Sequence, residues 1–182
     1  SYCEKIKIQY YNMNNLKNIY LDAFENGFGI ILIPFESKTH FTYSTEVVNY
    51  PLFVSKPIIG QIAGVPLDNK NNLNAVVYDG FNKKAFDDGA VVMHVKLPKN
   101  KLADIKVCNI FEPSGSHELE FDEEGFYVKT VKVKGKEHNF IDYIKENNID
   151  IRFPLVGTLK NAMPTIVSFR EIDENNEIVH LY

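Results

Sequence analysis

The stretch AVVMHVKL, residues 90–97, decides the fold, because apolar residues recur in it at every second position. This spacing is typical of a strand that presents one face to a core. Asp87-Asp88-Gly89 supplies a turn before the stretch, and Pro98-Lys99-Asn100 ends it. We therefore predict a central strand with His94 and Lys96 on its other face and four buried side chains: Val91, Met93, Val95 and Leu97.

Three further apolar runs lie on either side of this strand, each bounded by turn residues. They are IIGQIAG at residues 58–64, NAVVYDG at residues 74–80 and DIKVCNIF at residues 104–111. Short runs rich in β-branched residues favour strands. We expect residues 57–135 to form a central sheet, in which Cys108 is a buried thiol on a strand beside that of His94.

The N-terminal part, residues 1–56, predicts a compact βαβ-like unit. It contains an alternating strand, a helix capped by Asn14 or Asn15, and a strand that is apolar on both faces: residues 4–11, 14–24 and 28–35. The residues that follow favour either a covering loop or a short helix over residues 44–50, which Pro51 would end.

The C-terminal part, residues 136–182, predicts one helix, capped by His138 or Asn139, and two strands. The strands are residues 164–170 and 177–182, and a hairpin of residues 119–121 and 126–133 precedes the helix. The whole chain is predicted to be a single α+β domain, residues 1–182. Its fold is an extended mixed or antiparallel β-sheet with a few short helices, and we expect the natural chain to continue past Tyr182.

Composition narrows the function classes. The 182 residues are 45% hydrophobic and 13% aromatic, which is enough for a packed core, and the net charge is −4. An acidic chain without a lysine-rich face argues against nucleic acid as a partner. The longest apolar run, residues 28–35, is too short for a bilayer helix, so we expect no membrane insertion. Two cysteines, Cys3 and Cys108, are too few for a disulfide framework, which favours a cytoplasmic location.

Candidate chemistry is sparse. Five histidines have no metal-site spacing, so we expect neither a bound metal nor a cofactor: His40, His94, His117, His138 and His180. The adjacent carboxylates Asp87 and Asp88 are typical of a solvated turn. A hydrolase-like enzyme that uses His94, Cys108 or His117 stays open as an alternative, although a Gly-x-Ser-x-Gly elbow is absent.

Short motifs follow one another in a recognisable order along residues 57–182. They are GQIAG at residues 60–64, DGAVV at residues 88–92, Pro113-Ser114-Gly115, and PLVG at residues 154–157. This order resembles the FIST family, sensory domains of bacterial signalling proteins that bind small ligands. The family's second glycine is replaced by Gln61 here.

The resemblance implies a non-catalytic sensory module in signal transduction. Its partners would be a small polar metabolite, an amino acid for example, and a signalling protein. Glycine lets backbone N–H groups approach a ligand, and ligands collect at loops on a rigid scaffold. We therefore predict a ligand site between two turns, formed by Gly60, Gly64, Ser114, Gly115, Ser116 and His117. A third hypothesis is a protein-interaction module whose sheet edge, residues 177–182, pairs with a partner.

Overall fold

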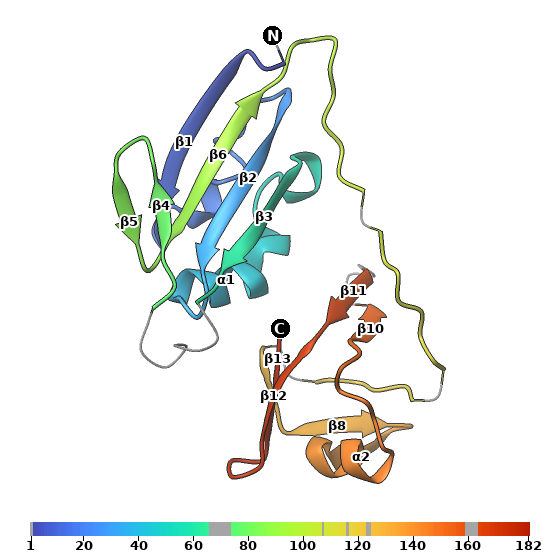
Figure 1. Ribbon diagram of the computed structural model, residues 1–182. Helices are drawn as coiled ribbons and strands as arrows, with labels where there is room; N and C mark the ends of the chain where they lie inside the picture. Colours follow the sequence, from blue (N-terminus) through green and yellow to red (C-terminus); the bar gives the residue numbers. More distant parts are fainter. Residues whose placement is uncertain (1, 66–73, 107, 116, 123–124, 159–163) are drawn as a thin grey trace. The chain divides into compact units, whose positions relative to one another are not determined.

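The computed structural model describes residues 2–65, 74–106, 108–115, 117–122, 125–158 and 164–182 (Figure 1). Within them, thirteen strands and two α-helices form an α+β protein, as the sequence predicted. No helix in these residues has the length and apolar character that a bilayer span needs. The sequence predicted one domain, and the chain has two compact units, Ser1–Lys106 (unit 1) and Val107–Tyr182 (unit 2).

Unit 1 is built on a four-stranded sheet in the order β1-β6-β2-β3. The strands are β1 (Lys5–Tyr11), β6 (Ala90–Lys96), β2 (Gly27–Pro34) and β3 (Ile58–Ala63). β6 runs antiparallel to both of its neighbours, and β2 and β3 are parallel. β6 and β2 are therefore interior strands, as the sequence predicted, and β3 lies at an edge of the sheet.

The parallel strands β2 and β3 are joined by α1 (Lys38–Glu46) and two 3-10 turns, Val47–Asn49 and Phe53–Ser55. The Ser37 side chain caps α1 by accepting a hydrogen bond from the His40 N–H at 3.1 Å. The short helix expected over residues 44–50 overlaps α1 only at residues 44–46, and a 3-10 turn follows at Val47–Asn49.

The helix predicted from Asn14 to Phe24 is wrong, because only one 3-10 turn forms there, Leu16–Asn18. The Asn12 N–H donates to Asn15 Oδ1 at 2.7 Å, and the Asn14 N–H donates to Asn12 Oδ1 at 2.9 Å. Such local side-chain bonds to the backbone compete with helix formation. Of the four apolar side chains expected on one face of that helix, Leu16, Ile19 and Tyr20 are buried and Phe24 is half-buried.

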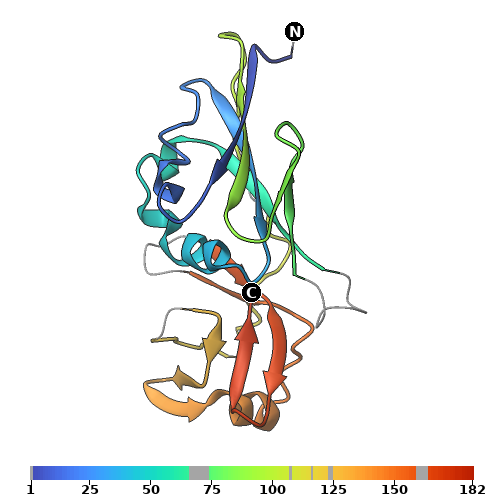
Figure 2. The ribbon, with the colours of Figure 1, turned by 90° about the vertical axis from the view of Figure 1, so that its left-hand side faces the viewer.

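The two faces of the unit 1 sheet have different coverings. Figure 2 shows the helical segments on one face and the hairpin of β4 (Val77–Asp79) and β5 (Lys84–Phe86) on the other. We call the second face the open face. Under the helical segments lies the core of unit 1: Tyr11, Leu16, Ile19, Tyr20, Ile31, Ile33, Tyr50, Ala90 and Val92.

Burial along β6 only partly follows the predicted alternation. Val91, Val95 and Leu97 are buried as predicted and Lys96 is exposed, but Met93 is only half-buried. On the opposite face Val92 and His94 are both 0% exposed. The strand is therefore covered on both sides, and its deepest residues face the helical segments.

Unit 2 has a second core around α2 (Phe140–Glu146). Its strands are β7 (Tyr127–Val128), β8 (Thr130–Val133), β9 (Lys136–Asn139), β10 (Leu155–Thr158), β11 (Pro164–Val167), β12 (Phe169–Asp173) and β13 (Ile178–Leu181). They form one three-stranded sheet, β12-β13-β7, and two hairpins, β8-β9 and β10-β11. Buried side chains of these strands and of α2 together form the core of unit 2: Val128, Val131, Phe140, Ile141, Tyr143, Ile144, Val179 and Leu181.

In unit 2 the sequence predicted the helix cap correctly, but two of its strand assignments differ from the structure. Asn139 caps α2 as expected, because its Oδ1 accepts the Asp142 N–H at 3.1 Å. Residues 164–170 split into β11 and the start of β12, whereas one strand was predicted. The predicted hairpin of residues 119–121 and 126–133 reduces to a single bridge between Glu120 and Lys132, since β8 pairs with β9.

Two further expectations are wrong. Residues 177–182 do not form a sheet edge, because β13 lies between β12 and β7. The run at residues 104–111 is not a strand in its described residues, where Ile110 is 85% exposed. A run of β-prone residues forms a strand only where another strand is available to pair with it.

Candidate functional site

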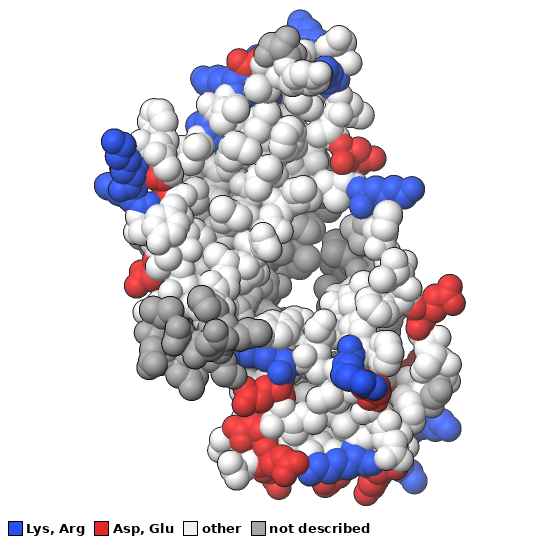
Figure 3. All heavy atoms as spheres, viewed as in Figure 1, with Lys and Arg blue, Asp and Glu red and all other residues white. Residues whose placement is uncertain are grey.

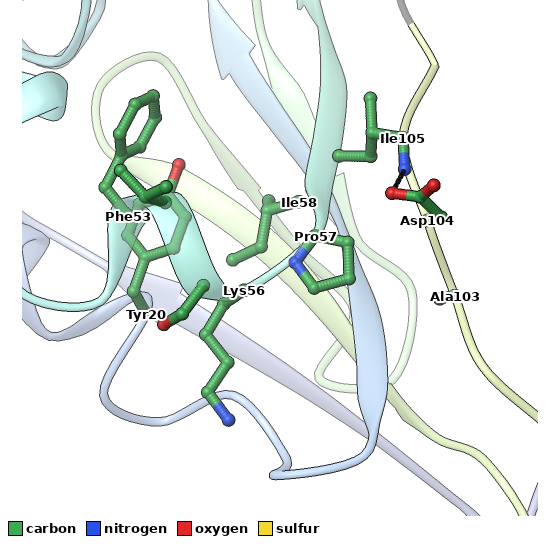
Figure 4. Close-up of a pocket in the computed structure, with 10 residues that line it drawn as sticks. Tyr20, Phe53, Lys56, Pro57, Ile58, Ala103, Asp104 and Ile105 are labelled. Atoms are coloured by element: carbon green, nitrogen blue, oxygen red, sulfur yellow. Dashed lines mark hydrogen bonds between the residues drawn. The ribbon is translucent and has the colours of Figure 1, made fainter.

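A groove of about 310 Å³ lies at the beginning of β3, within unit 1 (Figure 4). The chain that leads into β3 forms one wall, residues 103–105 form the opposite wall, and Ile58 and Ile105 both border the gap. Its lining is Tyr20, Phe53, Val54, Ser55, Lys56, Pro57, Ile58, Ala103, Asp104 and Ile105.

The charged groups of the groove are engaged with backbone atoms. Lys56 Nζ donates to the carbonyl oxygens of Phe24 at 3.2 Å and Glu25 at 3.4 Å. Its side chain runs away from Ile105 in Figure 4. The Asp104 carboxylate accepts the Ile105 N–H at 2.9 Å. The lining combines aromatic and aliphatic side chains with the polar side chains of Ser55, Lys56 and Asp104, so the groove offers a mixed surface to a bound group.

Buried tyrosines support the aromatic wall of the groove. The Tyr20 ring meets the Phe53 ring edge to face, with 5.5 Å between centroids. The hydroxyl oxygens of Tyr20 and Tyr43 are 2.7 Å apart, and burial raises the pKa of both phenols. The wall is therefore a hydrogen-bonded, packed surface and is formed before any ligand arrives.

The outer edge of β3 presents backbone groups that no described strand pairs with. The Pro57 and Ala63 carbonyls accept the N–H groups of Gly29 and Phe35, each at 2.9 Å, so odd-numbered residues direct their peptide groups toward β2. In a parallel ladder the alternate residues direct theirs outward. The outward residues are Ile58, Gly60 and Ile62.

β3 lacks the features that usually protect an edge strand. Natural edge strands are shortened, bulged, or fitted with lysine or proline so that no other chain adds to them. β3 runs for six residues, IIGQIA, and contains neither a charged residue nor a proline. Gly60 and Ile62 are exposed. An edge of this kind is a template for another strand.

The open face beside this edge is apolar. Ile6, Leu32 and Ile59 are 52%, 37% and 53% exposed, and four further apolar side chains are half-buried: Ile8, Phe28, Ile30 and Met93. Figure 3 shows the middle of this face without Lys, Arg, Asp or Glu, which lie toward its margins. Apolar patches of several hundred Å² on a surface usually mark interaction sites.

A buried polar chain links Asp22, Tyr11 and His94 on the helix-covered side. The Tyr11 hydroxyl donates to Asp22 Oδ2 at 3.1 Å and lies 2.8 Å from His94 Nε2. Since the one phenolic proton is directed at Asp22, His94 donates from Nε2, and its Nδ1 has no partner among the described residues. Burial and, to a smaller extent, the charge of Lys7 together lower the pKa of His94 to about 4, while the charge of Asp22 opposes the shift.

Comparison with known proteins places the chain in a family. A protein-family model matches residues 1–182. The chain belongs to DUF6976, a family of unknown function. No curated protein and no solved structure matches it.

The two glycines predicted to form one ligand turn have different surroundings in this DUF6976 chain. Gly60 lies inside β3 opposite Ile31, where an added Cβ would come within 2.0 Å of the Ile31 carbonyl oxygen. Gly64 follows the end of β3 and has no atom within 4 Å of an added Cβ. Packing therefore requires glycine only at residue 60.

The other predicted site residues belong to unit 2 of the DUF6976 chain. Ser114, Gly115 and His117 are exposed and lie outside helices and strands, and Ser116 lies outside the described residues. Gly115 has a φ of +71°, a conformation that favours glycine, and His117 Nδ1 is 3.0 Å from the Tyr143 hydroxyl. A joint site with the glycines of unit 1 stays a prediction.

The expected pairing of His94 with Cys108 on neighbouring strands is wrong. The neighbours of β6 are β1 and β2, and Cys108 is exposed outside any strand. Among the described residues of the DUF6976 chain, no group of three or more His, Cys, Asp or Glu is placed to hold a metal ion.

One feature of the sequence indicates the β3 edge: no charged residue occurs from residue 57 to residue 64. The groove left no such signal. Its walls come from segments around residues 20, 55 and 104 of the DUF6976 chain, and only the fold brings these together.

Proposed function

We propose that the protein is a non-catalytic, cytoplasmic interaction module that binds an extended protein strand along β3. The observation that carries the proposal is the row of outward peptide groups on an uncharged edge strand. Strand addition of this kind gains affinity from main-chain hydrogen bonds and specificity from alternate side chains. The apolar open face and the groove at Pro57 supply the surfaces that would contact those side chains.

The enzyme hypothesis gains less from the structure. The His94 ring is fully buried in a polar chain with Tyr11 and Asp22, where a substrate has no access to it. Cys108 and His117 are exposed, and His117 Nδ1 lies 3.0 Å from the hydroxyl of Tyr143. Neither is placed beside a general base in the described residues.

Selection of peptides against the folded chain tests the proposal. A random library of twelve-residue peptides should yield binders with alternating apolar residues and few prolines or charges. Ile62→Pro should weaken their binding at least tenfold, since it removes an outward N–H without removing a bond to β2. Ile62→Thr keeps that N–H and is the matched control. Binders with equal affinity for both variants would contradict the proposal.

A second candidate function is small-molecule sensing, which the FIST resemblance implies. The groove supports it, because about 310 Å³ lies at the lower end of the volumes of small-ligand sites and its lining combines apolar and polar side chains. A ligand that binds only the folded state raises the melting temperature. A thermal-shift screen of amino acids and small acids therefore tests this function, and a screen without any shift argues against it.

Two variants locate the site of any hit from that screen. Phe53→Ala removes an aromatic wall of the groove, and Ser114→Ala removes a hydroxyl of the site predicted from the sequence. A shift lost only in Phe53→Ala assigns the ligand to the groove. A shift lost only in Ser114→Ala assigns it to the predicted turns.

A further inference from the structure

We propose that β3 pairs antiparallel with β3 of a second copy of this chain, about a two-fold axis through Gly60. The inference rests on the proposed function and names the partner of the same edge. Two four-stranded sheets then join into one sheet of eight strands. A two-fold interface uses the same patch on both copies, so the patch must complement itself.

The outward residues of β3 satisfy that condition. With the axis at Gly60, two residues of the two copies lie opposite each other when their residue numbers add up to 120. Ile58 then faces the partner's Ile62, and Gly60 faces the partner's Gly60. All three are outward residues, so each pair exchanges both N–H···O=C bonds of an antiparallel ladder.

Side chains in this register are compatible. On the open face, Ile59 lies opposite the partner's Gln61, and on the helix-covered face isoleucine meets isoleucine. No charged residue occurs between residues 57 and 64, so no like charges come together. The register centred on Gly60 pairs all three outward residues of β3, whereas a register centred on Gln61 would pair only Gly60 and Ile62 within the strand.

The groove lies where the end of the partner strand would run. In this register the partner's Ile62 lies opposite Ile58 and the partner's Ala63 lies opposite Pro57, and both Ile58 and Pro57 line the groove (Figure 4). Tyr20, Phe53 and Ile105 complete an apolar surround for an isoleucine side chain. The volume of about 310 Å³ suits one large side chain and one small one.

The pairing also extends the open face. Ile59 of each copy lies beside the axis, and Ile30 and Leu32 lie one strand further away on the same side of the joined sheet. The apolar surface that stops at the β3 edge in one copy then becomes continuous with the apolar surface of the other copy. Such continuity adds hydrophobic contact to the main-chain bonds.

The mass of the full chain in solution tests the inference. Sedimentation equilibrium should show a monomer–dimer equilibrium, and Ile62→Pro should weaken dimerisation at least tenfold. Ile62→Val keeps both the N–H and an apolar β-branched side chain, and it should change dimerisation less than threefold. Far-ultraviolet circular dichroism checks that each variant is folded. A monomer at all concentrations, or equal dimerisation of the two variants, overturns the inference.

Cysteine cross-linking tests the register. In a background of Cys3→Ser and Cys108→Ser, the double variant Ile59→Cys, Gln61→Cys places thiols opposite each other, within disulfide range. It should form a linked dimer on mild oxidation, and each single variant should not. Linkage of Gln61→Cys alone means a slipped register and overturns the axis at Gly60.

The outcomes also separate the inference from the proposed function. If the chain is monomeric and selected peptides still bind in a manner that depends on the Ile62 N–H, the edge binds a strand of another protein and only the inference fails. If neither a dimer nor a peptide is found, both fail. Where both are found, excess peptide should dissociate the dimer, because they compete for one edge.

Discussion

The buried ring of His94 makes the stability of the folded chain depend on pH. Its ring is 0% exposed, and it donates to the oxygen of Tyr11 while its Nδ1 accepts nothing in the described part of the chain. The charged groups around it are Lys7, which opposes a proton on the ring, and Asp22, which favours it. The neutral form is therefore the one that this environment stabilises.

The free energy of unfolding should fall as the pH falls from about 6.5 to about 4. The pKa of His94 is lowered from 6.5 to about 4 in the folded state, so between these values only the unfolded chain takes up the proton. A shift of this size corresponds to about 3 kcal/mol. Urea denaturation at several pH values measures it.

His94→Gln should remove that part of the pH dependence. His138→Gln, in unit 2, is the control and should leave it in place. A wild-type slope that persists in His94→Gln would assign the effect to other groups.

Gly60 and Gly64 should respond very differently to alanine. Gly60→Ala places a Cβ within 2.0 Å of the Ile31 carbonyl oxygen, so β3 must move away from β2, at a cost of about 3 kcal/mol or more. Gly64→Ala meets no atom within 4 Å and should stay within about 1 kcal/mol of wild type. Thermal denaturation compares the two, and equal losses would contradict the placement of Gly60 inside the strand.

At the scale of elements, the sequence predicted what depends on neighbours along the chain. The alternation of residues 90–97, the apolar run of residues 28–35 and the cap at Asn139 each specify their element locally. The helix at residues 14–24 failed because asparagine side chains satisfy the backbone there. The strand at residues 104–111 failed because a strand needs a partner, and a partner is not a local property.

Loss of the cap on α2 should be measurable. Asn139→Ala removes the acceptor of the Asp142 N–H and should lower the free energy of unfolding by about 1 kcal/mol. Asn139→Asp keeps an acceptor oxygen and should retain most of the stability. Chemical denaturation monitored by circular dichroism gives both values, and a larger loss in the aspartate variant would argue against capping.

At the scale of the molecule, two cores lie in two stretches of the chain. Hydrophobic content predicts that a core exists, but not how many, so the sequence favoured a single domain with one central sheet. The candidate site likewise depends on contacts between residues that are far apart in the sequence. The edge of β3 follows from strand order, and strand order depends on contacts between residues 27–34 and residues 90–96. No short motif encodes such contacts.

Each unit should unfold in its own transition. Val92→Ala opens space in the core of unit 1, and Val131→Ala does so in unit 2, where the two side chains are 0% and 1% exposed. Each should destabilise its own unit by about 1–3 kcal/mol and leave the other unchanged. Hydrogen exchange resolved by peptide, across a urea series, reports both units at once. Parallel shifts in the two units would show a single cooperative domain.

The strand that makes recognition possible is also a hazard. β3 has six uncharged residues, three of them isoleucine, and no proline, which are features of the segments that stack into amyloid fibrils. A partner bound to β3 therefore also prevents aggregation through this strand. Aggregation becomes more favourable when the chain is made in excess of its partner. Heated samples should bind thioflavin T sooner when the edge is vacant, and Gln61→Lys, which adds the missing charge, should delay the signal. Occupancy of β3 by a partner would therefore limit aggregation of the protein in the cell.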